Sequence, residues 1–555
     1  MIRYITRPVF LLPLDRRAGD PLFVQELGIC HIPGSCATEG VILQTPTTHT
    51  TTSAPVSPQV ESAATGTELR SESYVEHAMP QVLRTSDLIF LFVIILFFIT
   101  NIGNAAAGGP AGISLWVIGG LLFFLPCGIA TQQLGALFPY EGGIYNWTNH
   151  TFGRGLGFFV GFIAWVPGPL LILATAELIV NIVQGLNAKW LADPRSQGIA
   201  LLAIIAFSCI VALQRQRTLQ GILKGVFVLI LIATGLVFIS GLVWILHGHP
   251  PATDFHPGAS WNPFTTGNFP LFGVITLGYL GVNLPLNQGG ELATPHGPAR
   301  RRSITGHVLW GSLLVLLFYL ASTFGVLIVQ GQNASFSLFA PVSTVDMAMG
   351  PFWGGATAVC VMATLMVATI IYNTVFARFL LVGGIDQRIP IRWGMLNNNR
   401  IPASVIILQA SIAGVLAVLF FLVVPYVGIL SGSPAHLAAS LYFVLVGTAT
   451  ILWAVGTAFL FINLLWLLLR KGTILRPLQI FPSWVLALSS LVGLAVGLIA
   501  IVDTVQNSYD PPDVPNGTWL VVVSVLSGVF LVIGFLGGMI ASQEATWQGM
   551  SDRSE

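Results

Sequence analysis

The sequence predicts an all-α polytopic membrane protein, and its composition and hydropathy support this fold class. Apolar residues make up 54% of the 555 residues. Charged residues make up only 8%, against about 25% in ordinary soluble domains. The mean hydropathy is +0.81. Charged residues are too few to cover the surface of a water-soluble protein of this size. Soluble enzyme folds are therefore excluded. A net charge of +1 gives no reason to expect a nucleic-acid partner.

The first 84 residues differ from the rest of the chain. The segment from Thr45 to Thr67 is rich in Ser, Thr and Pro and has no apolar period. Such a segment buries too little apolar surface to fold. We therefore expect residues 1–84 to form a disordered cytoplasmic tail. A start at Met79, directly ahead of the first apolar stretch, is the alternative.

Twelve apolar stretches are long enough to cross a bilayer, which takes about 20 residues. Bounded by charged residues or by Gly and Pro, they cover 87–107, 111–137, 152–187, 198–213, 219–246, 269–292, 304–330, 354–384, 403–425, 436–469, 482–503 and 517–541. We therefore expect 12 transmembrane helices in a transporter domain over 85–541. A cytoplasmic C-terminal tail is expected over 542–555.

Arg and Lys are distributed unevenly between the two sets of connections. One set carries eleven: Arg215, Arg217, Arg300, Arg301, Arg302, Arg388, Arg392, Arg400, Arg470, Lys471 and Arg476. The other set carries two, Lys189 and Arg195. Because cytoplasmic connections are the ones rich in Arg and Lys, both termini are expected in the cytoplasm. We expect a multi-pass protein of the plasma membrane.

Two of the twelve stretches contain Gly and Pro where a continuous helix would not. The first includes residues 100–110, with Gly103 and Pro110, and the sixth includes residues 278–291, with Gly281 and Pro285. Unwound backbone is tolerated at membrane depth only beside protein or a water-filled cavity. Free N–H groups there favour a carboxylate and free carbonyls an ammonium group. Breaks five helices apart match the inverted repeats of secondary transporters, which predicts a binding site between them.

A motif between the second and third stretches reads Pro139-Tyr140-Glu141-Gly142-Gly143-Ile144-Tyr145-Asn146-Trp147. It resembles the signature of the amino acid–polyamine–organocation (APC) superfamily of permeases. Residues 289–300 and 373–402 are similar to further segments of that family. The resemblance implies the leucine-transporter-like fold, with two inverted repeats of five helices and two peripheral helices. It also implies an amino acid substrate held between helices one and six.

The resemblance assigns substrate contacts to both predicted breaks. The first set, expected to meet the carboxylate, is Ile102, Gly103, Asn104 and Ala105. The second set, expected to meet the amine, is Tyr279, Leu280, Gly281 and Val282, with Asn283 at its end. Tyr372 lies where some relatives place an aromatic ring over the substrate. For Tyr279 and Tyr372, simple packing is the alternative in a chain with 35 Phe and 14 Trp.

Four further polar residues within the stretches are candidates for ion coupling. Lys224 resembles the helix-five lysine of proton-coupled relatives, although its ammonium group could instead reach the lipid headgroups. Thr369 and Thr374 are the alternative, as sodium contacts. Glu177 lies roughly 35 Å along a helix from Arg154, so we expect water at the outer surface to solvate it. In the inner loop, Glu141 is interpreted as a gate residue or as part of a fixed connector.

These observations predict a secondary active permease that moves a small amino acid by alternating access, either proton-coupled or exchanging. An amino acid/polyamine antiporter is the first alternative. A membrane-embedded enzyme is the second, disfavoured because no phosphate loop, catalytic motif or metal-ligand spacing occurs. We expect no catalytic residue, no cofactor and no metal site. The expected partners are the substrate, H⁺ or Na⁺, and the lipid bilayer.

Overall fold

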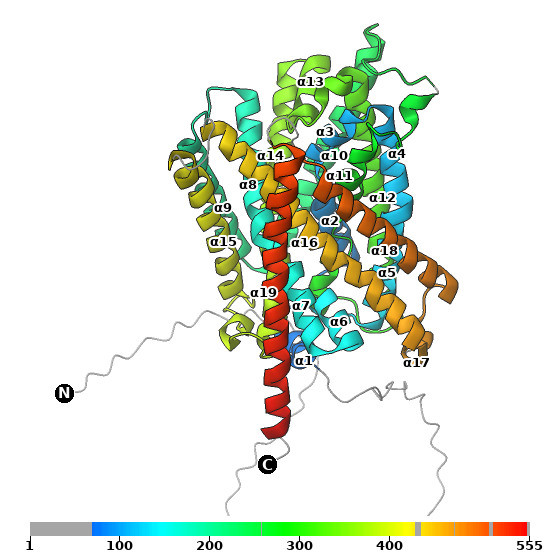
Figure 1. Cartoon of the computed structure of the whole chain (residues 1–555), viewed down its shortest axis with the longest axis vertical. Coiled ribbons are helices and arrows are strands. Elements are labelled where there is room, and N and C mark those ends of the chain that lie inside the picture. The colour runs from blue at the N-terminus through cyan, green and yellow to red at the C-terminus, as the bar shows by residue number, and fades with distance from the viewer. Residues whose placement is uncertain (1–68, 257, 428–433, 471, 510–513, 552–555) are drawn as a thin grey trace, which may run out of the picture. The chain divides into compact units, whose positions relative to one another are not determined.

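The computed structural model describes residues 69–551 apart from 257, 428–433, 471 and 510–513. This part of the chain is helical, with one isolated β-bridge between Leu83 and Leu292 (Figure 1). Ten of its helices are long and apolar enough to cross a membrane. The bent pair Thr85–Leu96 and Ile99–Ala107 would make an eleventh span. The predicted fold class is confirmed, whereas the expected sixth stretch, 269–292, is divided into short elements.

The long helices follow the apolar stretches closely. They are α5 (Leu125–Leu137), α7 (Arg154–Trp165), α8 (Pro167–Leu186), α9 (Pro194–Ala212), α10 (Gln216–Leu246), α12 (Pro298–Val329), α14 (Pro351–Ile385), α15 (Ala403–Ala417), α16 (Pro434–Arg470), α18 (Ser483–Gln506) and α19 (Asn516–Ser551). Helix α4 (Pro110–Gly119) joins α5 through one π-helical segment, Gly120–Phe124. The shorter helices are α1 (Arg70–Ala78), α2 (Thr85–Leu96), α3 (Ile102–Ala107), α6 (Ile144–Phe152), α11 (Phe272–Leu277), α13 (Ala340–Met349) and α17 (Gly472–Leu475).

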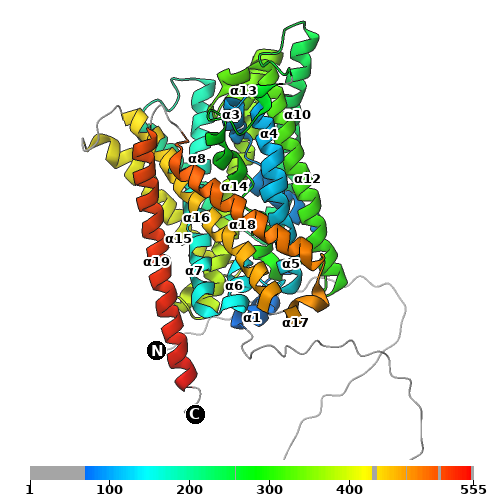
Figure 2. The same cartoon turned by 45° about the vertical axis from the view of Figure 1, so that its right-hand side comes forward.

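The connections between helices gather at two opposite ends of the bundle (Figure 2). Helix α13 lies at one of them, which we call the α13 end. Helices α1, α6 and α17 lie at the other, which we call the α1 end. Between the ends, α14 packs on α8 and α10, and α16 packs on α8 and α18. These central helices surround the region where the two interrupted stretches meet.

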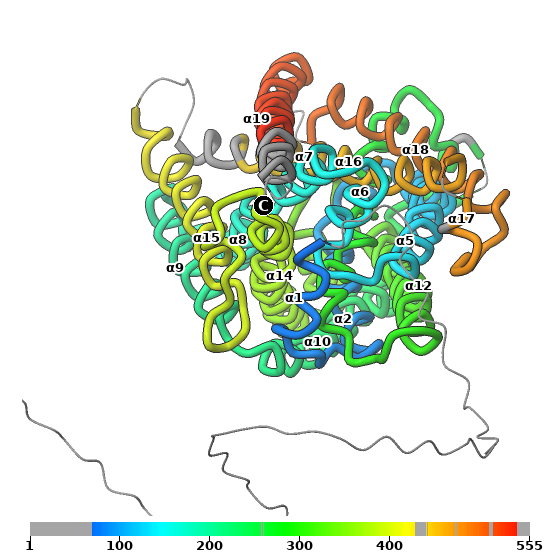
Figure 3. The backbone as a smooth tube through the Cα atoms, turned by 90° about the horizontal axis from the view of Figure 1, so that it is seen from below, coloured from blue at the N-terminus to red at the C-terminus, as the bar shows by residue number. Residues whose placement is uncertain are grey.

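The structure corrects the predicted boundaries of both tails. Residues 69–84 were expected to be disordered, yet α1 forms there and packs on α14 and on the 3₁₀ helix Leu284–Glu291 (η5). Figure 3 shows α1 lying across the α1 end between α14 and α2. Helix α19 continues to Ser551, beyond the expected boundary at 541. The rest of the predicted N-terminal tail lies outside the described residues.

Candidate functional site

The second predicted interruption lies where the sequence places it. Helix α11 ends at Leu277, the chain turns through residues 278–283, and η5 begins at Leu284 with Pro285 in its first turn. Gly281 has a φ of +109°, a conformation that glycine adopts easily and other residues do not. The prediction of a break in the sixth stretch is therefore confirmed.

The first interruption lies ahead of the residues predicted to be unwound, although the helix also ends at Ala107, before Gly109 (φ +55°) and Pro110, within the predicted segment. The chain leaves the helix at Phe97 and Phe98, which are extended, and returns to it at Ile99 in a 3₁₀ turn (Ile99–Asn101, η1). The residues expected to be unwound, 102–105, lie inside α3, and the Ile102 N–H is hydrogen-bonded to the carbonyls of Ile99 and Thr100. Alanines at 105–107 favour that helix more strongly than Gly103 opposes it.

Two buried tyrosines satisfy the backbone at this first break. The Tyr319 hydroxyl accepts a hydrogen bond from the Phe98 N–H (3.1 Å) and donates one to the Leu96 carbonyl (2.8 Å). The same hydroxyl lies 3.5 Å from the Gly278 carbonyl oxygen at the second break. The Tyr372 hydroxyl donates to the Ile95 carbonyl (2.9 Å). Neighbouring helices thus supply the partners that unwound backbone needs at membrane depth.

The start of η1 presents free backbone donors at the break. Within the described residues, the N–H groups of Ile99 and Thr100 have no hydrogen-bond partner. The first N–H groups of a helix are left over in this way and favour a negatively charged partner. The free N–H groups at the first break therefore belong to residues 99–100 and not to residues 102–105.

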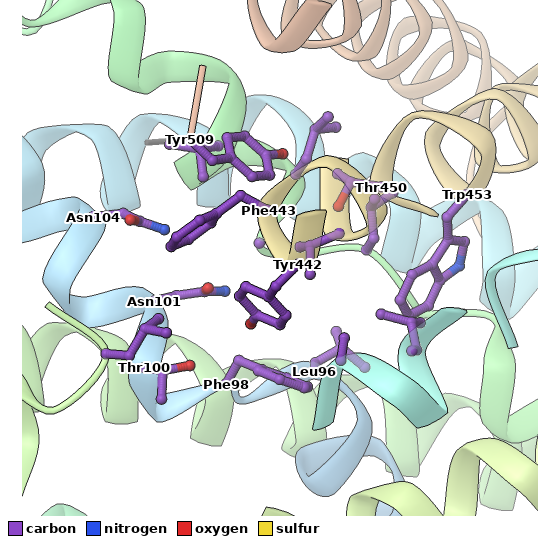
Figure 4. A pocket seen from close by; sticks show the side chains of 18 of the residues that line it. Leu96, Phe98, Thr100, Asn101, Asn104, Tyr442, Phe443, Thr450, Trp453 and Tyr509 are labelled. Carbon is purple, nitrogen blue, oxygen red and sulfur yellow. The ribbon is translucent and has the colours of Figure 1, made fainter. Parts of the chain in front are cut away.

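A cavity of about 100 Å³ lies between the two breaks (Figure 4). In Figure 4 the amides of Asn101 and Asn104 point toward the rings of Tyr442 and Phe443. The walls are polar or aromatic on several sides, and among the described residues that form them none is charged. They are Ile95, Leu96, Phe98, Thr100, Asn101, Asn104, Leu171, Ala174, Val274, Leu277, Gly278, Leu280, Leu338, Tyr372, Tyr442, Phe443, Val446, Thr450, Trp453 and Tyr509.

Of the predicted substrate contacts, Asn104, Leu280 and Tyr372 lie in the cavity wall. Gly281 lies one layer behind it, because a Cβ atom there would come within 2.8 Å of Trp453 and 3.0 Å of Ile95. The other predicted contacts do not line the cavity: Ile102, Gly103, Ala105, Tyr279, Val282 and Asn283. The structure therefore brings together only part of the predicted set.

Tyr279 points away from the cavity, toward α4. Its hydroxyl donates to the Trp116 carbonyl (2.9 Å), and its ring stacks on Phe124 with centroids 4.4 Å apart. These contacts are those of a packing residue. Packing is the alternative role that the sequence allows for Tyr279.

The predicted coupling residues also lie outside the cavity wall. Lys224 Nζ is 3.6 Å from Asp87 Oδ1, and the lysine side chain is 54% exposed. The Thr369 hydroxyl lies 2.8 Å from Thr175 Oγ1, joining α14 to α8. Thr374 donates to the carbonyl of Ile371 in its own helix. Among the described residues, no group of three or more His, Cys, Asp or Glu could hold a metal ion.

Helix α16 supplies a large part of the cavity wall, but none of its residues is among the predicted substrate contacts. Tyr442, Val446 and Thr450 recur every four residues, and Trp453 follows at a spacing of three. This spacing places all four on one face of a helix. A polar and aromatic stripe on an otherwise apolar span was the signal available in the sequence.

The prediction for Glu177 is also wrong. Its side chain is buried, only 4% exposed, instead of solvated. Oε1 accepts a hydrogen bond from Asn181 (3.2 Å), and Oε2 has no partner among the described residues. Ala174, one helical turn away, lines the cavity, and the carboxylate interacts electrostatically with Tyr442. Helix α16 covers the face of α8 that we expected to meet water.

The cavity continues toward the α13 end. A second hollow of about 140 Å³ shares Asn104, Val274 and Tyr509 with it. Residues from the connections at that end, among them Phe336 and Asn516, line this hollow. The cavity therefore extends toward the α13 end.

The α1 end is closed by three buried charged residues, which we call the closing cluster: Glu141, Glu291 and Arg378. Arg378 Nε lies 3.1 Å from Glu141 Oε1, and the same guanidinium is paired with Glu291. The Gly290 N–H donates to Glu141 Oε2 (3.0 Å). Arg378 lies six residues from Tyr372, or roughly 9 Å along α14 toward the α1 end. The cluster therefore lies between the cavity and that end.

Comparison with known proteins identifies relatives with one common activity. The sequence profile of the amino acid permease family matches residues 83–530. An uncharacterised transporter of Legionella pneumophila is 23% identical over 62% of this chain and 74% of its own length. The probable agmatine/putrescine antiporter of Lactococcus lactis is 23% identical over 42% and 49%. The aspartate–proton symporter of Bacillus subtilis is 24% identical over 38% of each chain. The chain thus spans less than half of the last two relatives.

Proposed function

The chain belongs to the amino acid permease family, and from this premise we propose that it carries a small amino acid by secondary active transport. Members and relatives are transporters, so the protein is a multi-pass membrane transporter and not an enzyme. The proposal adds the substrate class and the alternating-access mechanism to that coarser assignment.

The observation that carries the proposal is the uncharged cavity at the two helix breaks. A zwitterionic amino acid needs hydrogen-bond donors for its carboxylate and acceptors for its ammonium group. The free N–H group of Thr100 and the side-chain amide of Asn101 offer donors on one side. The carbonyls of Gly278 and Leu280 offer acceptors on the other. An apolar amino acid side chain fits the aromatic wall of α16.

The extension of the cavity toward the α13 end and the buried ion pairs on the α1 side support alternating access. With the Arg-rich α1 end in the cytoplasm, the described conformation receives substrate from outside the cell. Release into the cytoplasm requires the closing cluster to separate. We propose a location in the plasma membrane with both termini inside, which the distribution of Arg and Lys supports.

Counterflow into proteoliposomes tests this function. Vesicles containing the purified chain and unlabelled substrate are given a panel of radiolabelled neutral, acidic and basic amino acids and diamines. We expect accumulation of neutral amino acids, with protein-free vesicles as the control. If no member of the panel accumulates, the proposed function is wrong.

A second candidate substrate class, amines with a net positive charge, is favoured by Glu177. A buried carboxylate one turn from the cavity wall attracts a cation, and two relatives are named for agmatine, putrescine or polyamine transport. If such amines are carried, Glu177→Gln is expected to lower their counterflow at least about tenfold, a cost of roughly 1.4 kcal/mol. The counterflow of neutral amino acids is expected to stay within twofold of the wild-type rate, which corresponds to about 0.4 kcal/mol. Equal effects on both classes would exclude a selective role for Glu177.

A further inference from the structure

The closing cluster contains more negative than positive charge, and its three side chains are buried away from water. Its two carboxylates and one guanidinium sum to a charge of −1 if all three are ionised. Glu291 is fully buried, and Glu141 and Arg378 are each 1% exposed. An uncompensated charge in such a place costs several kcal/mol, so a buried group neutralises itself instead. The composition of the cluster therefore favours one additional positive charge.

The hydrogen bonds of the cluster leave room for a proton. Glu291 gives one oxygen to Arg378, and its Oε2 has no partner among the described residues. Arg378 would repel a metal cation at this position, whereas a proton forms an O–H bond with a carboxylate and removes the excess charge. Burial, followed by the neighbouring Glu291 carboxylate, raises the pKa of Glu141 well above its ordinary value, against the opposing effect of Arg378.

Other titratable groups around the cluster already have partners. Asp386 accepts hydrogen bonds from the Tyr145 hydroxyl and from Ser71, and it interacts with Arg388. On α1, Glu72 pairs with His150 and Glu76 with His296. On α12, Arg300 contacts His296 and interacts with Tyr140. None of these contacts supplies the cluster with its missing positive charge.

Helix α1 keeps water away from this site. Val75 is 1% exposed, and a Cβ atom built at Gly290 would lie 2.6 Å from it and 3.2 Å from Glu141 Oε2. The buried face of α1, which carries Val75, thus covers the cluster from the α1 end. The three charged residues come from three segments, the loop after α5, η5 and α14, so separating these segments admits water to all three.

We propose that the closing cluster is a proton-binding site, at which one proton shared by Glu141 and Glu291 holds the α1 end closed. The proton forms an O–H bond with a carboxylate oxygen in the closed state. It passes to water at the α1 end when the cluster opens, which leaves both carboxylates ionised and hydrated. The two carboxylates titrate together, so the proton belongs to the pair. This inference names H⁺ as the ligand that controls the proposed transport cycle and rests on that function.

A substrate-free measurement tests the site directly. Thermal unfolding of the purified full chain in detergent is followed from pH 5 to pH 8. A carboxyl group with a raised pKa binds more protons in the folded state than in the unfolded state above its ordinary value of 4.5. Stability is therefore present at low pH and lost as pH rises. We expect the unfolding temperature of the wild type to fall by roughly 2 °C or more across this range.

Two single variants and one control make this test specific. Glu141→Gln and Glu291→Gln each give the cluster the net charge of its protonated form, so both are expected to fold and to show a flatter pH dependence. Asp87→Asn removes another buried carboxylate, which accepts a hydrogen bond from the Arg84 N–H, and should keep the wild-type slope. Wild-type slopes in both glutamine variants would overturn the proposal.

Counterflow at equal pH on both sides of the membrane is the second arm. The wild-type rate is expected to rise with pH, by up to about tenfold per unit for one titrating site. Both glutamine variants should be slow and independent of pH. A wild-type rate that does not change with pH would overturn the proposal. Absence of any counterflow would refute the proposed function, and the unfolding measurement would still decide the proton site.

Discussion

Transport by Gly281→Leu is expected to be abolished, while the variant still inserts into the membrane. The φ of +109° at this position costs a residue with a side chain about 1–2 kcal/mol. Its Cβ atom would also meet Trp453 at 2.8 Å and Ile95 at 3.0 Å, and such overpacking costs about 1–3 kcal/mol. Both neighbours line the cavity, so relieving the clash moves its wall. A counterflow rate at least about tenfold below wild type is therefore expected.

The matched control is Gly225→Leu in α10. Gly225 is exposed on its helix, and a Cβ atom there meets nothing within 4 Å. Both variants receive the same side chain, but only Gly281→Leu disturbs the break. Membrane yield and the size-exclusion profile report insertion and folding. Wild-type counterflow by Gly281→Leu would argue strongly against a site at the second break.

A large loss of stability is expected for Arg378→Met. The variant leaves Glu141 and Glu291 buried beside each other without their shared cation. Removing one partner of a buried ion pair costs about 3–5 kcal/mol. We expect a markedly lower unfolding temperature and little transport, measured on purified protein and in proteoliposomes.

Charge restoration separates this electrostatic effect from simple loss of packing. Combining Arg378→Met with Glu141→Gln and Glu291→Gln removes every charge of the cluster, and much of the lost stability should return. Arg378→Lys keeps the charge but not the planar fork that contacts both carboxylates, so an intermediate result is expected. An unfolding temperature for Arg378→Met equal to that of the wild type would contradict this account.

Hydropathy and the positions of Gly and Pro were sufficient to predict the helical membrane fold and the second break. Pro285 removes a backbone donor, and Gly281 permits the left-handed turn, so both effects are local and visible in the sequence. The spacing of the apolar stretches likewise located most long helices, because each must cover the bilayer on its own.

The first break could not be located in this way, because its cause is not local. Phe97 and Phe98 do not oppose a helix, and the backbone groups they leave are satisfied by Tyr319 and Tyr372, more than 200 residues away. Glu177 was misplaced for a related reason, since only the packing of α16 shows that water does not reach it. The position of the first break and the burial of Glu177 are both determined by contacts between helices that are far apart in the sequence.

The docking of α1 also has a practical consequence for handling the polypeptide. Its contacts, from Ser71 on Asp386 to Val75 on Gly290, come from residues that precede Met79. A product that starts at Met79 would retain the long helices but lose α1 and its contacts at the α1 end. The products that start at Met1 and at Met79 would then differ in how tightly the α1 end closes without substrate. An affinity tag fused directly to residue 79 would report on the product without α1.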